Sequence, residues 1–374
     1  MTAFMRGLLT ATLKDNPYLE FGVLTGVYRV AKESIFSGLN NLKVYTIFDT
    51  PMADKFGFTE EEVAKMLKHY ELGEEDKKVV DEWYGGYGIG DAENLYNPWS
   101  VLSYISERTE GKRRSDRAAQ PYWINTSSND LIIEQIKSNK NIKMEIDKLL
   151  QGKEVSLTID QWLSLRELEK RKDGVWVLFA KGGYLTAEWV RNSKYAFRIP
   201  NEEVLNFFKD AVMEWIEERT DIEMTRMLDE LDIMLQEGEY GGFVEYLKRF
   251  IESGLRYYDV ARDEPERFYK GFFLGMLSIA INGYKVESEM ESGYGRLDVV
   301  IYSKDKTYGN YAAIFEMEKA KSEKQLEDLA KQALEQIRER KYHAKVKEKG
   351  YKVIAFGIAF SGKRVGIEVE ILKA

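Results

Sequence analysis

The sequence predicts a protein of several domains in the mixed α/β and α+β classes. With 374 residues, the chain is longer than most single domains. Residues 203–280 place apolar side chains mainly at helical spacing, whereas short apolar runs split by Gly, Asn and Asp follow between residues 297 and 315. Hydrophobic residues make up 44% and charged residues 32%, a balance typical of folded globular chains. We therefore expect a helical region followed by a strand-rich C-terminal domain.

The composition excludes several classes of site. The chain has no cysteine, so disulfides, thiol nucleophiles and cysteine-based zinc or iron–sulfur sites are excluded. Its two histidines, His69 and His343, argue against a Ser-His-Asp triad or a multi-histidine metal site. No run approaches the roughly 20 apolar residues of a membrane span, and the N-terminal apolar stretch is too short for a secretory signal. We therefore expect a cytoplasmic protein without membrane contact.

The charge is unevenly distributed along the chain. The net charge is −8, with +3 on residues 261–374 and −11 on residues 1–260. A basic C-terminal region attached to an acidic remainder permits contact with nucleic acid at that end.

The N-terminal third mixes helix signals with one apolar run. Phe21–Val30 is apolar and rich in β-formers, which predicts a buried strand. Thr59 followed by Glu62 forms a capping-box pattern and predicts a helix from about residue 60 to Tyr70. Asn97-Pro98 predicts a turn with a helix after it.

The middle of the chain predicts helices and one hairpin. Polar and charged residues at 106–120 indicate an exposed loop. The pattern of residues 127–152 is helical, and another helix is predicted to start within Leu157–Asp160. Residues 175–198 predict two strands joined by a turn, and Asn201 is placed to cap the helix that follows. Helices with such a hairpin are compatible with a winged-helix-like region, a class that contacts either DNA or proteins.

The C-terminal region contains a hairpin that carries three carboxylates. Apolar runs at Leu297–Tyr302 and Tyr311–Phe315 are joined by a polar loop and predict two paired strands. Asp298 opens the first strand, while Glu316 and Glu318 end the second, on one face because side chains alternate along a strand. Convergent carboxylates are ligands that Mg²⁺ prefers. The alternative is that these carboxylates are solvated charges at a sheet edge.

An Asp in a hairpin followed by such a Glu resembles the PD-(D/E)XK nuclease superfamily. The wider context is similar to the nuclease-like domain found behind an AAA-ATPase-like domain in many bacterial proteins of unknown function, and rests on ERFYKGFFLGML, YKVESEMESGYGRLDVVIY, IFEMEKA and QALEQIRERKYHAKV. Upstream, TGV, SIFSGLNNL, GFTEEEV, WYGGY, YNPWSVL and YWINTSSND resemble the C-terminal half of that AAA-ATPase-like family, so the likeness covers residues 4–374.

The resemblance implies three parts. Residues 1–105 would be a truncated AAA-like ATPase remnant with a helical lid, and residues 106–255 a mainly helical, winged-helix-like middle region with a β-hairpin. Residues 256–374 would form a restriction-endonuclease-like α/β core of order α-β-β-β-α-β.

The resemblance also implies a site that holds Mg²⁺ or Mn²⁺. Asp298 and Glu316 would be its ligands, with the carbonyl of Met317 as a third and Glu289 and Glu266 as further candidates. Two positions depart from the family pattern, since Lys270 stands where the family has His and Glu318 stands where it has the catalytic Lys. The candidate catalytic residues are accordingly Asp298, Glu316, Glu318, Lys331 and Gln332, and the candidate nucleic-acid contacts are Arg296, Lys324 and Gln336.

No phosphate-binding loop is evident in the sequence. The near-match GIAFSGKR, Gly357–Arg364, has Arg364 where the Mg²⁺-binding hydroxyl belongs and is better explained as a turn between two strands. In the family this loop lies upstream of the strand that corresponds to Phe21–Val30. We expect no ATP binding by this chain alone.

Three functions remain open from the sequence. The first is a Mg²⁺-dependent nuclease, with catalysis impaired by Glu318 in place of Lys. The second is a non-catalytic module that binds nucleic acid or protein. The third is a remnant of an ATPase–nuclease fusion whose ATPase half is a missing partner. An apolar strand at Phe21–Val30 would need cover, which favours a homo-oligomer.

Overall fold

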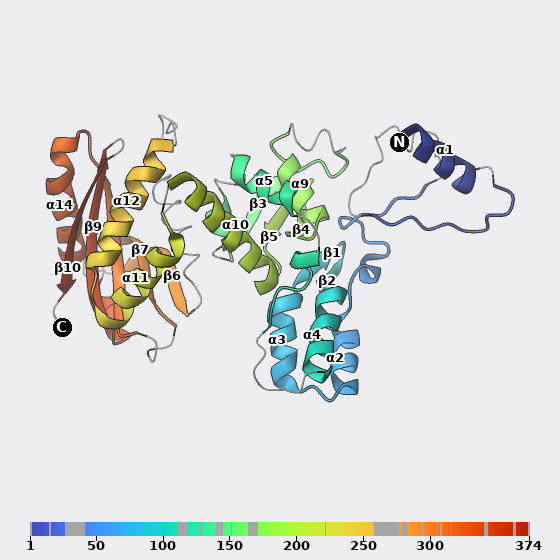
Figure 1. Cartoon of the computed structure of the whole chain (residues 1–374), viewed down its shortest axis with the longest axis horizontal. Helices are drawn as coiled ribbons and strands as arrows, with labels where there is room; N and C mark the ends of the chain where they lie inside the picture. Colours follow the sequence, from blue (N-terminus) through green and yellow to red (C-terminus); the bar gives the residue numbers. More distant parts are fainter. Residues whose placement is uncertain are drawn as a thin grey trace. The chain divides into compact units, whose positions relative to one another are not determined.

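The computed structural model describes two compact units, Met1–Phe208 and Lys209–Ala374 (Figure 1). The residues it describes are 2–14, 16–26, 42–110, 119–126, 129–139, 142, 145–150, 152–163, 171–220, 222–257, 277, 283–292, 295–304, 306, 309–339, 343–361 and 364–372. The division into three parts at residues 105 and 255 stays a prediction. Among the described helices, none has the length and apolar character that a membrane span requires.

The N-terminal segment differs from its prediction. Helix α1 covers Thr2–Leu13, but Phe21–Gly26 forms no strand, and Phe21 and Val23 are 81% and 71% exposed. A strand needs a hydrogen-bonded neighbour, and no described residue pairs with this segment. The predicted buried strand is therefore wrong for these six residues. The rest of that prediction, Val27–Val30, lies outside the described residues.

A small helical subdomain follows. Its elements are η1 (Ala53–Lys55), α2 (Glu60–His69), α3 (Glu74–Tyr84), the hairpin β1 (Tyr87–Ile89) and β2 (Ala92–Leu95), and α4 (Pro98–Glu110). The predicted capping box is confirmed, because Thr59 accepts from the Glu62 amide and Glu62 accepts from the Thr59 amide. The helix predicted after Asn97 is confirmed too, but α4 runs through residues 106–110, where a loop was expected.

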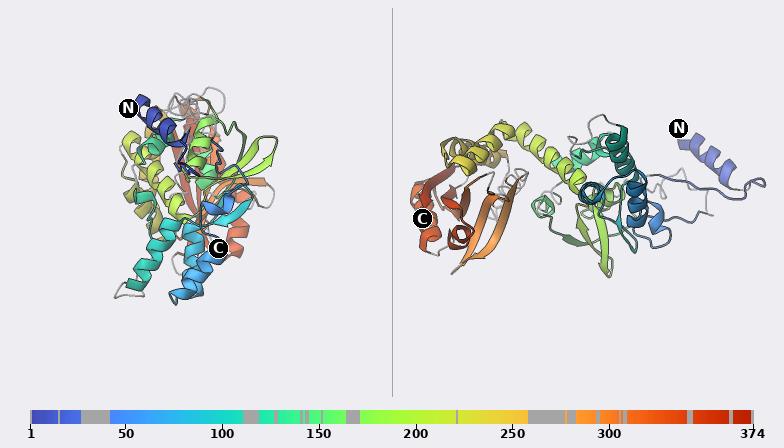
Figure 2. Two further views of the ribbon diagram at one scale, coloured as in Figure 1. Left: turned by 90° about the vertical axis from the view of Figure 1, so that its right-hand side faces the viewer. Right: turned by 90° about the horizontal axis from the view of Figure 1, so that it is seen from below.

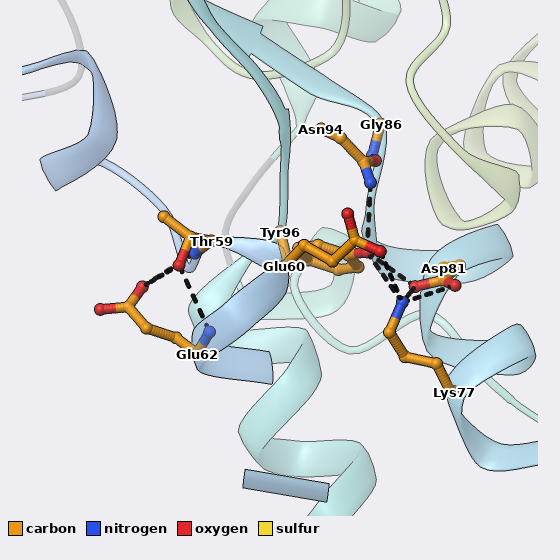
Figure 3. Close-up of polar contacts among 8 residues, drawn as sticks. All are labelled: Thr59, Glu60, Glu62, Lys77, Asp81, Gly86, Asn94 and Tyr96. Carbon is orange, nitrogen blue, oxygen red and sulfur yellow. Dashed lines mark hydrogen bonds and ion pairs between the residues drawn. The ribbon is translucent and has the colours of Figure 1, made fainter. Parts of the chain in front are cut away.

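Polar contacts tie the β1–β2 hairpin to α3 (Figure 3). The Tyr96 hydroxyl donates to Oδ1 of Asp81 at 2.7 Å, and Lys77 Nζ donates to both oxygens of that carboxylate at 2.5 and 2.7 Å. Asn94 Nδ2 donates to the Tyr96 hydroxyl at 3.3 Å, while its Oδ1 accepts from the Gly86 amide at 3.2 Å. Burial lowers the pKa of Lys77, but its hydrogen bonds to Asp81 and Tyr96 outweigh burial and leave that pKa above its ordinary value. The network fixes the hairpin on the helix.

The rest of this unit contains short helices and a three-stranded antiparallel sheet. The helices are η2 (Ile124–Thr126), α5 (Asp130–Ser138), α7 (Ile146–Leu150) and α9 (Gly174–Lys181). The strands are β3 (Val155–Thr158), β4 (Thr186–Arg191) and β5 (Lys194–Arg198), in the order β3-β5-β4. The β4–β5 hairpin projects from its unit in both views of Figure 2.

Two predictions for this region are wrong. Leu157 lies in strand β3 and not in a helix. The run after Gly174 forms helix α9 and not a strand, with every residue from Val175 to Ala180 buried. A continuous apolar run carries no period, so its sequence cannot separate a buried strand from a buried helix. Packing decides, as Trp176 meets Phe197 and Phe179 meets Phe208 at ring-centroid distances of 5.6 and 5.8 Å.

The start of α10 (Glu202–Thr220) holds a fully buried carboxylate. Glu203 accepts a hydrogen bond from Ser100 Oγ at 2.8 Å and from the amides of Tyr122 and Trp123 at 2.7 Å each. Burial nevertheless raises the pKa of Glu203. Asn201 Oδ1 accepts from the Val204 amide at 3.2 Å, so the predicted cap is confirmed. Glu203 therefore joins α10 to α4 and to the segment before η2.

The second unit is built on a five-stranded mixed sheet of order β10-β9-β8-β7-β6. Only the β8–β9 pair is parallel among the described strands. Its elements are α11 (Met224–Glu237), α12 (Gly241–Tyr257), β6 (Tyr284–Ser292), β7 (Gly295–Ser303), β8 (Tyr311–Lys319), η3 (Glu323–Gln325), α14 (Leu326–Glu339), α15 (His343–Glu348), β9 (Lys352–Ser361) and β10 (Arg364–Leu372). The predicted strand pair β7–β8 and the terminal hairpin β9–β10 are confirmed.

Helices cover both faces of this sheet. On one face, Leu334 and Ile337 of α14 share a buried cluster with Ala312, Ile314 and Ala355. On the other, Phe243 of α12 packs against aromatic rings at an odd position of β8 and an even position of β9. In Figure 1, β9 and β10 lie between α14 and α12. The carboxylates at even positions of β8 therefore belong to the α14 face.

Candidate active site

The strand register aligns three acidic positions across β6, β7 and β8. Val299 pairs with Phe315 in the last pair of the described β7–β8 register, and Asp298 and Glu316 are the next residues of the two strands. On the other side of β7, the pairs Ser288–Val299 and Met290–Leu297 bracket Glu289 opposite Asp298. Opposed positions of antiparallel strands lie on the same face of a sheet. The backbone therefore places Glu289, Asp298 and Glu316 in one row.

Glu316 is buried in the centre of the sheet, with only 5% of its surface exposed. Ile314 and Ala312, which precede Glu316 on the same face of β8, are completely buried. A carboxylate in such surroundings requires hydrogen bonds, an ion pair or a metal ion, because removal from water is costly. The alternative of a solvated charge at a sheet edge is therefore wrong for Glu316.

Glu318 lies two residues further on the same face and has a defined partner. Gln336 of α14 donates from Nε2 to Oε1 of Glu318 at 2.9 Å. Both side chains are half-buried. The contact fixes the direction of one carboxylate oxygen and leaves the other oxygen for a further ligand.

The two flanks of α14 face different neighbours. Arg338 forms an ion pair with Glu370 of β10, and Lys331 lies two turns earlier on that flank. Gln336 lies on the flank that reaches Glu318. Lys331, Gln332 and Lys324 are exposed, so among the four candidates from η3 and α14 the structure brings only Gln336 to the β8 carboxylates.

Gly357 is a residue of this site that the sequence did not reveal. It pairs with Glu316 in the parallel β8–β9 ladder. A Cβ atom at Gly357 would collide with the backbone carbonyl of Ala330 and come within 2.6 Å of the Leu334 amide. The missing side chain therefore lets α14 approach the sheet beside Glu316, and this approach brings Gln336 within reach of Glu318.

Several candidates cannot be placed as side chains. Glu266 and Lys270 lie outside the described residues, while Glu289, Arg296 and Asp298 are described as strand positions only. Met317 pairs with Ile358 of β9. Among the side chains that the structure does describe, no three acidic or histidine residues gather as a metal site. The backbone row of three acidic positions is nevertheless an all-oxygen donor set, which suits Mg²⁺ or Mn²⁺.

Comparison with known proteins relates the C-terminal part of the chain to a family of nucleases. The family model of the PD-(D/E)XK nuclease superfamily matches residues 264–370. A relative from Azotobacter chroococcum mcd 1, "Uncharacterized protein in vnfD 5'region", is 24% identical over 379 residues, which cover 98% of this chain. The chain spans 66% of that relative's length. Residues 264–370 thus resemble the PD-(D/E)XK nuclease superfamily, and this span includes the row of acidic strand positions.

Proposed function

We propose that the C-terminal domain hydrolyses phosphodiester bonds in nucleic acid with the help of a divalent cation. The observation that carries this proposal is the arrangement on β8. There a buried Glu316 lies one residue beyond the Val299–Phe315 pair, as Asp298 does on β7, and Glu318, which follows it, is held by Gln336. A buried carboxylate such as Glu316 is costly in a hydrophobic core unless it has partners. Together with the acidic strand positions beside it, Glu316 matches the ligand chemistry of Mg²⁺ and Mn²⁺.

Asp298 and Glu316 would hold the cation, with Glu289 as the next position in the row. When bound, such a cation polarises the phosphoryl group and lowers the pKa of water. Glu318 would accept the proton of the water that attacks phosphorus, while the bond from phosphorus to the leaving oxygen breaks. Gln336 holds Glu318 in one orientation through its 2.9 Å hydrogen bond, and a fixed base is the requirement for proton transfer.

Base reading by helix α9 of the other unit has no support in the structure. Helix α9, which precedes the β4–β5 hairpin, is buried from Gly174 to Ala180. A buried helix cannot enter a major groove. We place the proposed nucleic-acid contact in the C-terminal unit, which carries the acidic strand positions.

The test is a cleavage assay on the full chain. Supercoiled plasmid, single-stranded DNA and labelled RNA are each incubated with Mg²⁺, with Mn²⁺ and with EDTA. We expect cleavage of at least one substrate with metal and none with EDTA. Glu316→Gln should abolish cleavage, whereas Gln332→Leu on the exposed side of α14 should leave it unchanged. Metal-independent cleavage, or equal rates in wild type and Glu316→Gln, would refute the proposal.

A further inference from the structure

Lysine and tyrosine side chains gather at one end of the C-terminal sheet, away from the acidic row. We call Lys285, Lys306, Lys349, Tyr302 and Tyr351 the lysine–tyrosine patch. Lys349 Nζ lies 4.4 Å from the ring centroid of Tyr302 and donates to its hydroxyl at 2.7 Å. The rings of Tyr302 and Tyr351 lie 5.4 Å apart, and Lys306 Nζ lies 5.5 Å from the Tyr351 centroid. These contacts form a continuous chain from Lys349 to Lys306.

The backbone around the patch orients the Tyr351 ring and leaves room for Lys306. Tyr351 donates its hydroxyl to the carbonyl of Ser303 at 2.8 Å, which fixes its ring between the two lysines. Gly350 adopts φ +84°, a conformation that favours glycine. A Cβ at Gly350 would meet Lys306 Nζ at 2.5 Å. The turn therefore brings the ends of β7 and α15 together and leaves room for Lys306.

One half-buried carboxylate organises the patch. Glu287 accepts from the Tyr302 hydroxyl and pairs with Lys285, both at 2.7 Å. Lys349 Nζ lies 3.9 Å from the same carboxylate oxygen. Glu287 thus holds Tyr302 beneath Lys349.

Positive charge exceeds negative charge at this end of the sheet. The described side chains in 284–287, 302–306 and 348–352 include five exposed lysines but two glutamates, Glu287 and Glu348; the lysines are Lys285, Lys304, Lys306, Lys349 and Lys352. Ammonium groups that are held over aromatic rings and left exposed are suited to phosphates. The rings of Tyr302 and Tyr351 are themselves buried and support the lysines.

The patch and the acidic row lie on one face of the sheet but apart from each other. Tyr302 lies four residues from Asp298 along β7, which is about 13 Å at the usual rise per strand residue. Both positions are on the same face, because their residue numbers differ by an even number. Val300 between them is completely buried in the cluster that includes Leu334 and Ile337 of α14. A substrate that reaches both places therefore has to pass around α14.

We propose that the lysine–tyrosine patch binds the phosphate backbone of the substrate at a distance from the phosphate that is cleaved. The inference rests on the proposed nuclease function, because the second point of contact with the substrate is the acidic row. It assigns affinity to the patch and chemistry to the acidic row. Sequence preference should not depend on the patch, since phosphates carry no base identity.

The test measures binding of the full chain to a fluorescein-labelled DNA duplex by anisotropy in EDTA, over a range of salt concentrations. Each phosphate contact contributes about 0.9 to the slope of log affinity against log salt. We expect Lys306→Gln/Lys349→Gln to lower that slope by about 1 to 2 and to weaken binding by about tenfold or more at physiological salt. Lys306→Arg/Lys349→Arg, which keeps the charges, should bind nearly as wild type does. Lys248→Gln, an exposed lysine on α12, serves as the surface control.

Failure of this inference is distinguishable from failure of the proposed function. An unchanged slope and affinity in Lys306→Gln/Lys349→Gln would overturn the patch, whether or not the protein cleaves DNA. No binding of duplex by wild type would overturn it as well. Glu316→Gln should keep the wild-type slope while losing cleavage. If wild type never cleaves but the slope still depends on the two lysines, the nuclease proposal fails and the patch stands. Equal melting temperatures confirm that each variant is folded.

Discussion

Gln336 on α14 donates a hydrogen bond of 2.9 Å to Glu318 on β8, two residues beyond the buried Glu316. This contact links the helix on one face of the sheet to the position where the superfamily pattern carries a lysine. A carboxylate that is held by an amide has a fixed direction, which a proton acceptor or a metal ligand needs. We therefore expect Glu318 to take part in the chemistry of the site.

Replacement of Gln336 by Leu should reduce cleavage by about 10- to 100-fold, the usual cost of losing a partner that orients a site residue. Gln332→Leu is the matched control, because it makes the same exchange one helical turn earlier at an exposed position. The measurement is kcat and KM for metal-dependent cleavage by both variants. A Gln336→Leu enzyme as fast as the Gln332→Leu enzyme would show that the hydrogen bond has no role in catalysis.

Glu318→Lys separates two roles of this position. The superfamily pattern alone predicts that this change restores a lost lysine and raises activity. The hydrogen bond from Gln336 leads to the opposite expectation, a loss of about 100-fold or more, because a lysine at neutral pH cannot accept the proton. Single-turnover cleavage rates at saturating metal decide between them, and a rate above wild type would favour the lost-lysine account.

Gly357→Ala tests whether the close approach of α14 builds the site. The new methyl group would collide with the backbone of Ala330, so the helix has to move away from β9. We expect a loss of about 1–3 kcal/mol in the free energy of unfolding together with reduced cleavage. Gly152→Ala provides a glycine control in the other unit with no atom within 4 Å, although its φ of +71° adds local strain. Full activity in Gly357→Ala would mean that α14 need not lie this close.

Glu203 predicts a pH dependence of stability in the other unit. Burial raises the pKa of Glu203, so the native state binds this proton more tightly than the unfolded state. The contribution of Glu203 to stability therefore falls as pH rises from the ordinary value near 4.5 through the raised pKa, and is constant above it. Glu203→Gln does not titrate, so its melting temperature should rise relative to wild type between pH 4.5 and neutrality.

A second variant, Glu203→Ala, tests the contribution of the hydrogen bonds of Glu203 to stability. Glu203→Ala leaves Ser100 and two backbone amides without their acceptor, which should cost about 1–3 kcal/mol or more. Melting curves of wild type and of both variants at several pH values give the comparison. A constant difference between Glu203→Gln and wild type across the pH range would contradict the raised pKa.

The parts of the fold that the sequence predicted are those with local causes. The Thr59–Glu62 capping box and the β7–β8 pair depend on residues close together in the chain, and both are present. Alternation along β8 likewise placed Glu316 and Glu318 on one face, and Gln336 bonds to Glu318 on the face where α14 lies. Short-range patterns are reliable because few alternative arrangements compete with them.

The failures have tertiary causes. The run Val175–Ala180 is apolar throughout, and its helical form depends on packing against residues of β5 and α10. Phe21–Gly26 also carries apolar side chains but has no paired strand among the described residues. Gly357 contributes to the site through the absence of a side chain, and only the helix opposite it reveals this role.

The most direct test of the proposed metal site is a calorimetric titration of the full chain with Mg²⁺ and with Mn²⁺, in parallel with melting curves. We expect saturable binding and a melting temperature that rises with metal concentration, since a ligand of the native state stabilises it by mass action. Both effects should be lost in Asp298→Asn and in Glu316→Gln and kept in Gln332→Leu. Absence of binding in wild type, or the same isotherm in Glu316→Gln, would contradict the claim that these strand carboxylates hold a catalytic cation.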